Sequence, residues 1–380
     1  MIKRRKVFYV MGFDPRGTSF YHALLRRESR LSKRRGFSHW QAGTMQPAWL
    51  YGETCHAAPE GDTTIEHIDY EFMSITDLVT DYFRLPLLTR IIQFLRLAVY
   101  AFACGFMRNS YGRARYFTLF MFYPAGVLAL VMLLSLLAGA GLGWWVGGLA
   151  GWLAFALTTP LVATLLIALI KRFEARFYIF YLIGDFLFSV RALMEPFEAF
   201  DSRLDQFADR VLEALRETGD EAADEVVMVG HSSGGLLAIL LAERLVERCT
   251  PAERQRLALV TLGNQASLAL FPKAAAFRCG IAKLINSPGL TWLDIFAPQD
   301  VISSGRFELP RELEIEQQPG SGYRFVSARL KEQVTEARYQ RIRHAFLTLH
   351  MQYLRASETG QGFNYFSMLE SPLRLRDQRI

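Results

Sequence analysis

The pentapeptide Gly230-His231-Ser232-Ser233-Gly234 contains the residues that could most directly do chemistry. The run EVVMVG at 225–230 leads into it, and an apolar segment, 234–249, leaves it. A strand that turns sharply into a helix needs very small residues around the turn, and it leaves the serine exposed above the helix. Free N–H groups at that helix N-terminus can stabilise a developing oxyanion. The pattern predicts that Ser232 is a nucleophile; the alternative is an ordinary turn rich in glycine and serine.

With this strand, turn and helix, the chain resembles the α/β-hydrolase superfamily, and GHSSG is closest to its lipase and esterase branch. The resemblance does not extend over a central insertion in the chain. It implies that Ser232 attacks an acyl carbon. It also implies that the Ser233 N–H is one oxyanion donor and that a loop after an earlier strand supplies the other. The matching loop is GFDPRG at 12–17, which makes Phe13 and then Gly12 the candidates. A phosphate-binding loop is the rival interpretation, but GFDPRG lacks the Lys-Ser/Thr pair of a P-loop.

The superfamily order places an acid and then a histidine after the serine. In TWLDIFAPQD, Asp300 follows a predicted strand and Asp294 lies within it, so Asp300 is the first candidate and Asp294 the second. A turn-capping role is the alternative for Asp300. Of the two histidines that follow, we expect His350 to accept the serine proton while the acid holds its other nitrogen, with His344 as the alternative. The segment LHMQYL around His350 also resembles membrane-linked bacterial hydrolase-like proteins of unassigned function.

Neither a metal nor a cofactor is expected. The four cysteines, Cys55, Cys104, Cys249 and Cys279, have neither CxxC nor zinc spacing, and they do not suggest a disulfide framework. Acyl transfer through a serine needs no metal. His231 precedes the nucleophile and is expected to pack beside the turn.

The segments that must position these residues alternate between two patterns. Buried-strand patterns occur at 6–12, 65–73, 225–230, 256–263, 291–297 and 323–327. Helical patterns begin at Pro15 and at Asp201 or Ser202, which would cap an amphipathic helix, and a last helix or pair of helices is predicted at 337–356. This alternation predicts an α/β fold of the α/β-hydrolase type, with a mostly parallel sheet flanked by helices.

The window 116–170 interrupts the alternation and contains no Asp, Glu, Lys, Arg or His. Because about 20 apolar residues cross about 30 Å of hydrocarbon, it predicts transmembrane helices at about 117–138 and 144–170. Gly139–Gly143 would form the turn between them, with Trp144 and Trp145 as interfacial anchors. A buried hairpin in a soluble domain is the alternative. The chain then divides into residues 1–84 and 196–380 of one hydrolase domain, and a membrane insertion at 85–195.

Two segments beside this window, 85–102 and 176–190, are predicted to lie in the headgroup region, or alternatively in the core of the domain. Basic residues flank the window on both sides: Arg113 and Arg115, then Lys171, Arg172 and Arg176. By the positive-inside rule, the hydrolase domain is expected in the cytoplasm, on a multi-pass anchor in a bacterial inner membrane. The glycines Gly139, Gly143, Gly147 and Gly151 recur every four residues and could pack copies of the chain into a homo-oligomer.

The net charge of +6 and the basic runs 3–6 and 26–35 favour contact with membrane lipids, or serve solubility alone. No nucleic-acid-binding motif accompanies them. The sequence therefore predicts a membrane-anchored serine hydrolase that cleaves an ester or thioester of a lipid or acyl substrate through an acyl-serine. An acyltransferase on the same triad and a non-catalytic membrane scaffold on a hydrolase fold are the alternatives. A transporter or channel is disfavoured, because the predicted spans carry no charge.

Overall fold

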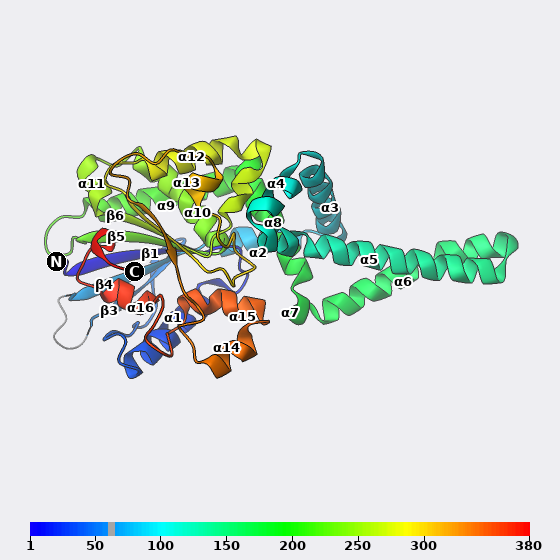
Figure 1. The fold of residues 1–380 in the computed structure, drawn as a ribbon, viewed down its shortest axis with the longest axis horizontal. Coiled ribbons are helices and arrows are strands. Elements are labelled where there is room, and N and C mark those ends of the chain that lie inside the picture. The colour runs from blue at the N-terminus through cyan, green and yellow to red at the C-terminus, as the bar shows by residue number, and fades with distance from the viewer. Residues whose placement is uncertain (60–64) are drawn as a thin grey trace.

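Among the described residues, eight strands form a mixed sheet at the centre of the domain (Figure 1). The computed structural model describes residues 1–59 and 65–380. The strand order is β2-β3-β4-β1-β5-β6-β7-β8; β2 and β3 pair antiparallel, and the strands from β4 to β8 are parallel. The strands are β1 (Arg4–Val10), β2 (Gln46–Trp49), β3 (Gly52–Ala57), β4 (His67–Met73), β5 (Glu225–His231), β6 (Leu257–Leu262), β7 (Thr291–Phe296) and β8 (Tyr323–Ser327). The predicted α/β fold with a mostly parallel sheet is confirmed.

Helices cover both faces of this sheet, because alternate side chains of a strand point to opposite sides. In β1, Val7 and Tyr9 enter one hydrophobic core, and Phe8 and Val10 enter the other. One face is covered by α1 (Gly17–Arg34), α14 (Glu336–Ile342), α15 (Phe346–His350) and α16 (Tyr365–Glu370), and the other by α9 (Glu198–Arg216), α10 (Ser233–Val246), α11 (Pro251–Arg256), α12 (Ala275–Ile285) and α13 (Leu309–Glu312) (Figure 1). Short 3₁₀ helices occur at Ala266–Leu270, Pro272–Ala274, Met351–Leu354 and Leu375–Asp377.

The remaining helices gather at the carboxyl end of the parallel strands, next to a long hairpin (Figure 1). They are α2 (Thr76–Arg84), α3 (Leu87–Ala103), α4 (Phe106–Arg113), α7 (Glu174–Phe177) and α8 (Ile179–Met194), and the hairpin consists of α5 (Arg115–Val146) and α6 (Gly148–Arg172). All seven lie in the chain between β4 and β5. The chain leaves β4 at this end, and β1 lies between β4 on one side and β5 on the other. The chain direction across the sheet reverses there, and such a switch point leaves a crevice at the strand ends where ligands bind.

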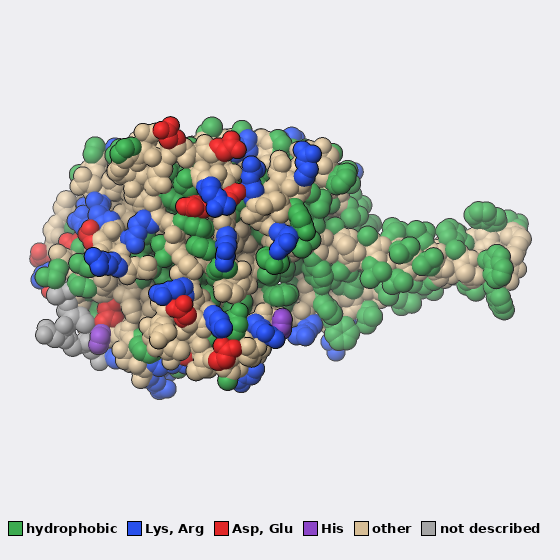
Figure 2. All heavy atoms as spheres, viewed as in Figure 1, with side chains coloured by type: hydrophobic (Ala, Val, Ile, Leu, Met, Phe, Trp, Pro, Cys, Tyr) green, Lys and Arg blue, Asp and Glu red, His purple; other side chains and the backbone are tan. Residues whose placement is uncertain are grey.

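The hairpin α5–α6 extends away from the domain, and hydrophobic side chains cover its surface (Figure 2). Both helices are long and apolar enough to cross a membrane. The first turns of α5 instead belong to the domain, since Phe117 and Met121 are buried in its core. The uncharged window is therefore partly a domain helix and partly an exposed hairpin.

The predicted turn of the hairpin was wrong by several residues. Helix α5 continues through Gly139–Gly143 to Val146, and the chain reverses at Gly147 and Gly148, whose φ angles are 71° and 55°. Gly139 and Gly143 instead form the contact with α6; a Cβ on Gly143 would lie 2.8 Å from the carbonyl oxygen of Gly151. The glycine ridge thus allows close approach within one chain, and association of several copies stays a prediction.

The segments that flank the hairpin differ from each other. In α3, Ile91, Phe94 and Leu97 face the core. The exposed side of α3 carries a stripe of large apolar residues, Leu88, Ile92, Leu95, Val99 and Phe102. Helix α8 is buried along most of its length. The prediction that 176–190 lies in the headgroup region is therefore wrong, and the core alternative holds for this segment.

Two further local predictions are corrected. Helix α1 begins at Gly17 instead of Pro15, and helix α9 begins at Glu198, so neither Asp201 nor Ser202 caps it. The last helix or pair predicted at 337–356 is a pair, α14 and α15, followed by a 3₁₀ turn. The edge strand β2 and its neighbour β3 were not predicted; β2 is short and contains a proline, which reduces the strand signal.

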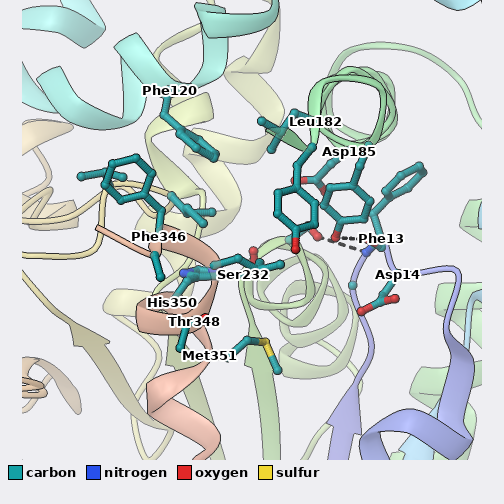
Figure 3. Close-up of a pocket in the computed structure, with 18 of the residues that line it drawn as sticks. Phe13, Asp14, Phe120, Leu182, Asp185, Ser232, Phe346, Thr348, His350 and Met351 are labelled. Carbon is teal, nitrogen blue, oxygen red and sulfur yellow. Dashed lines mark hydrogen bonds between the residues drawn. The ribbon is translucent and has the colours of Figure 1, made fainter. Parts of the chain in front are cut away.

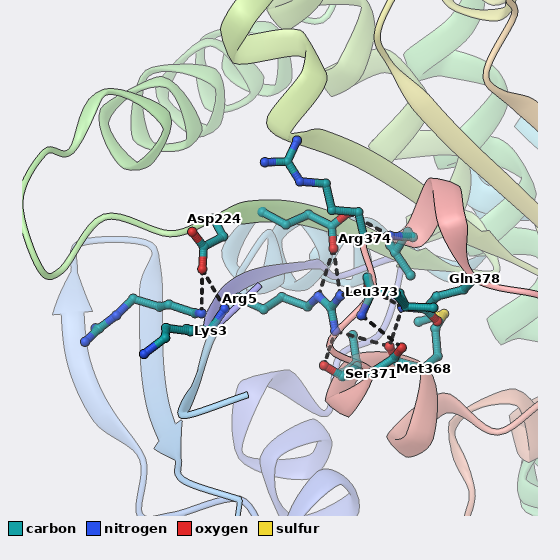
Figure 4. A network of polar contacts seen from close by, with 12 residues as sticks. Lys3, Arg5, Asp224, Met368, Ser371, Leu373, Arg374 and Gln378 are labelled. Atoms are coloured by element: carbon teal, nitrogen blue, oxygen red, sulfur yellow. Dashed lines mark hydrogen bonds and ion pairs between the residues drawn. The ribbon is translucent and has the colours of Figure 1, made fainter. Parts of the chain in front are cut away.

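A buried ion pair ties the C-terminal segment to the sheet (Figure 4). Arg5 Nη2 lies 2.8 Å from Glu225 Oε2, and both side chains are buried. The same guanidinium donates to the carbonyl oxygens of Met368, Leu369 and Leu373. A charge buried this deeply is tolerated because its donors are satisfied, and the contacts hold the last turns of the chain below β1 and β5.

Candidate active site

Ser232 lies at the turn between β5 and α10, at the carboxyl end of a central strand. Its φ and ψ angles are 60° and −130°, a conformation that residues other than glycine rarely adopt. The strain is local, because His231 is still paired with β6 and Ser233 is already the first residue of α10. The side chain is half-buried and lines a cavity of about 620 Å³.

The glycines of the pentapeptide are required by the close approach of three segments. A Cβ on Gly234 would lie 2.5 Å from the carbonyl oxygen of Val10. A Cβ on Gly230 would overlap the backbone of Gly234. Gly230 and Gly234 thus let β1, β5 and α10 approach one another closely. This is the steric requirement for small residues that the sequence pattern predicts.

Asp300 and His350 form a buried pair beside this turn. Asp300 lies in the loop after β7, and His350 is the last residue of α15. His350 Nδ1 lies 2.7 Å from Asp300 Oδ2, and Asp300 Oδ1 accepts the N–H of Ile302 at 3.1 Å. Burial opposes ionisation of Asp300, but the His350 ring and its hydrogen bond lower the pKa of this carboxyl below its usual value. The contact fixes His350 with Nδ1 as the donor, and Nε2 is buried with no hydrogen-bond partner.

His231 supports His350 from below. Its Nε2 donates to the carbonyl oxygen of His350 at 3.0 Å, and the two ring centroids are 4.4 Å apart. Burial, followed by the proximity of His350, lowers the pKa of His231 to about 3. His231 is therefore neutral near pH 7 and holds the backbone that carries His350.

The two candidate oxyanion segments are in direct contact. The N–H of Phe13 donates to Ser233 Oγ at 3.0 Å, and Tyr181 Oη donates to the carbonyl oxygen of Phe13 at 2.8 Å (Figure 3). Gly12 packs against α10, where a Cβ would lie 2.6 Å from Ser233 Oγ. The loop after β1 is thus held beside the first turn of α10, and the Phe13 N–H is already engaged by the Ser233 hydroxyl.

A second buried carboxyl, Asp185 of α8, lies above the same turn (Figure 3). It is 3% exposed and lines the cavity that Ser232 and His350 also line. Its Oδ2 accepts Nε2–H of Gln265 at 2.8 Å. Burial raises the pKa of Asp185 to about 6, and the hydrogen bond from Gln265 and the nearby hydroxyl of Ser233 limit the rise.

The alternative acid and the alternative histidine do not form the contact between Asp300 and His350. Asp294 is buried within β7, where it accepts hydrogen bonds from Thr261, Asn264 and Tyr323. Burial raises its pKa to about 7, and it does not line the cavity. His344 lies exposed at the cavity. Of the two acids, it is Asp300 that contacts His350.

Sequence reasoning missed three contributors: Asp185, the Ser233 side chain and the bond from His231 to His350. The one available signal for Asp185 was that it is the only acid in the apolar segment 176–190. Within the described ranges 1–59 and 65–380, no group of three or more His, Cys, Asp or Glu side chains is arranged to hold a metal.

A scan against protein-family models matches residues 177–267 to the family described as Lipase (class 3). This stretch runs from the end of α7 through the Ser232 turn to the 3₁₀ helix that follows β6. Searches of the curated proteins and of the solved structures find no match. The chain is therefore similar to class 3 lipases over the segment that carries Ser232, which supports a lipase-like hydrolase.

Proposed function

We propose that this chain is a membrane-anchored serine hydrolase that cleaves an ester or thioester of a lipid or acyl substrate, with Ser232, His350 and Asp300 as its catalytic triad. One observation carries the proposal. The strained Ser232 turn and His350 line the same cavity, Asp300 holds His350 Nδ1 from behind it, and His350 Nε2 is left without a hydrogen-bond partner. An unpaired buried nitrogen is unfavourable in a resting fold, and a base awaiting a proton accounts for it.

In the proposed reaction, Ser232 Oγ attacks the acyl carbon and His350 Nε2 accepts its proton. Asp300 holds the tautomer of His350 and stabilises the imidazolium that forms. His350 then gives the proton to the leaving alcohol or thiol, and water releases the acyl group by the reverse sequence. The backbone N–H of Ser233 is the first oxyanion donor, and the Phe13 N–H becomes the second once the Ser233 hydroxyl turns away from it.

The environment of the cavity supports a lipid-like substrate. Its wall includes Tyr116, Leu119 and Phe120 from the root of α5, the helix that continues into the hairpin. If the hairpin spans a bilayer, this wall lies next to the membrane surface, and an acyl chain can enter without crossing water. The exposed apolar stripe on α3 would then rest in the headgroup region.

The charges at the base of the hairpin fit the same orientation. Arg115, Lys171, Arg172 and Arg176 are exposed where the hairpin joins the domain. Facing anionic lipids, they would keep the hydrolase domain on the cytoplasmic side of a bacterial inner membrane.

A fluorophosphonate probe tests the enzymatic proposal on the full-length protein in detergent or vesicles. Labelling of the wild type should be lost in Ser232→Ala and kept in Ser202→Ala, which removes an exposed hydroxyl on α9. A folded wild-type protein that does not label would favour the non-catalytic scaffold. If the probe labels Ser232 but added alcohols capture the acyl group faster than water does, the enzyme is an acyltransferase.

A further inference from the structure

Two of the described side chains that line the catalytic cavity carry a buried polar atom with no hydrogen-bond partner: His350 Nε2 and Asp185 Oδ1. The proposed mechanism explains His350, because its nitrogen receives the serine proton. It gives Asp185 no task. Leaving a buried charged acceptor unpaired is unfavourable, so a group that arrives with the ligand is the simplest partner for Oδ1.

The orientation of the Asp185 carboxyl is fixed by the residues behind it. Ser189 Oγ donates to Gln265 Oε1 at 3.3 Å, which turns the amide NH₂ of Gln265 toward Asp185. That NH₂ donates to Asp185 Oδ2 at 2.8 Å. Of the two carboxyl oxygens, Oδ1 is therefore the one left for a ligand.

Asp185 is close to the position of the reacting carbonyl. It interacts with the hydroxyl of Ser233, whose backbone N–H is the proposed oxyanion donor. Ser233 Oγ in turn accepts the N–H of Phe13. A substrate whose carbonyl oxygen meets these donors brings its neighbouring atoms near Asp185.

We propose that Asp185 binds a hydroxyl group of the substrate, located within a few atoms of the scissile carbonyl. The inference rests on the proposed function and narrows its substrate class to hydroxyl-bearing acyl esters. A purely apolar ligand would displace cavity water and leave the carboxyl without a donor. An ammonium would bring three donors to a place that offers one free acceptor. With its pKa near 6, Asp185 is mostly an acceptor at neutral pH.

The hydroxyl can belong to either half of the ester, and matched substrates separate these sources. On the alcohol side, a monoacylglycerol is compared with the propyl ester of the same fatty acid. On the acyl side, a 3-hydroxyacyl methyl ester is compared with the unsubstituted acyl methyl ester. A hydrogen bond to a charged acceptor corresponds to about 10- to 100-fold in kcat/KM.

We expect wild-type protein to prefer the hydroxyl-bearing member of one pair by at least about tenfold. Asp185→Asn should reduce this ratio to within about threefold of unity. Gln265 keeps the amide oxygen of the new side chain, so an NH₂ group replaces the acceptor at the position of Oδ1. Asp294→Asn, at a buried carboxyl outside the cavity, should leave the ratio unchanged.

Equal ratios for wild type and Asp185→Asn, or no preference in either pair, would overturn the inference while leaving ester hydrolysis intact. Absence of both hydrolysis and probe labelling at Ser232 would instead count against the proposed function. Should Asp185→Asn fail to fold, inhibition of wild-type hydrolysis by a monoalkylglycerol ether and by the matching propyl ether gives the same comparison. Equal inhibition constants for the two ethers, together with equal wild-type kcat/KM for the two acyl methyl esters, would then refute the proposal.

Discussion

Replacing Asp300 with asparagine changes one atom of the side chain but reverses the hydrogen bonding of His350. Asp300 Oδ1 accepts the N–H of Ile302, and Oδ2 binds His350 Nδ1 at 2.7 Å. In Asp300→Asn, the amide oxygen is expected to stay with the Ile302 N–H, which needs an acceptor. The NH₂ group then faces His350 Nδ1 and forces the proton of the ring onto Nε2. The nitrogen that should take the serine proton no longer has a lone pair.

The expected loss in kcat is large, because both the tautomer and the stabilisation of the imidazolium are removed. Asp300 and His350 are 3% and 2% exposed, so solvent screens their interaction little. For this exchange in a Ser-His-Asp triad the loss is about 10⁴-fold, or about 5 kcal/mol of transition-state stabilisation.

The assay is hydrolysis of a p-nitrophenyl ester by full-length protein in detergent, with thermal melting to check folding. Asp294→Asn is the matched control, because this acid is equally buried but contacts Thr261 and Tyr323 instead of His350. Its kcat should stay within about threefold of wild type. A folded Asp300→Asn protein that retains more than a tenth of the wild-type kcat would refute the assignment of the acid.

Three further predictions concern the histidines and the hairpin. His350→Ala should abolish probe labelling, whereas His344→Ala, at an exposed position, should lower kcat/KM by less than about tenfold; equal losses would contradict the choice between them. Burial lowers the pKa of His231 to about 3, so between pH 6.5 and pH 3 the unfolded chain takes up a proton at this residue and the folded chain does not. The free energy of unfolding therefore decreases as the pH is lowered through this range. In His231→Gln this loss, about 1 kcal/mol between pH 6.5 and pH 5.5, should be absent from melting curves at these two pH values, and an unchanged difference would count against it. Gly143→Leu should separate α5 from α6 and expose the hairpin to proteolysis, while Gly141→Leu, where a Cβ meets open space, should not; equal proteolysis would refute the packing.

Some of these features could be predicted from the sequence because they depend on neighbouring residues. The Ser232 turn follows from a strand, two small flanking residues and a helix that are contiguous in the chain. The apolar hairpin follows from composition alone, since the uncharged window 116–170 is long enough for two apolar helices. The alternation of strands and helices likewise predicts the parallel sheet.

Other features depended on contacts between distant segments, and tertiary structure decided them. Whether Asp300 or Asp294 meets His350 depends on how the loop after β7 packs against α15. The turn of the hairpin moved to Gly147 because Gly143 was needed where the two helices touch. Asp185 became part of the cavity only when α8 packed against α10, because a lone acid in an apolar segment has no local pattern that shows which distant residue it will face.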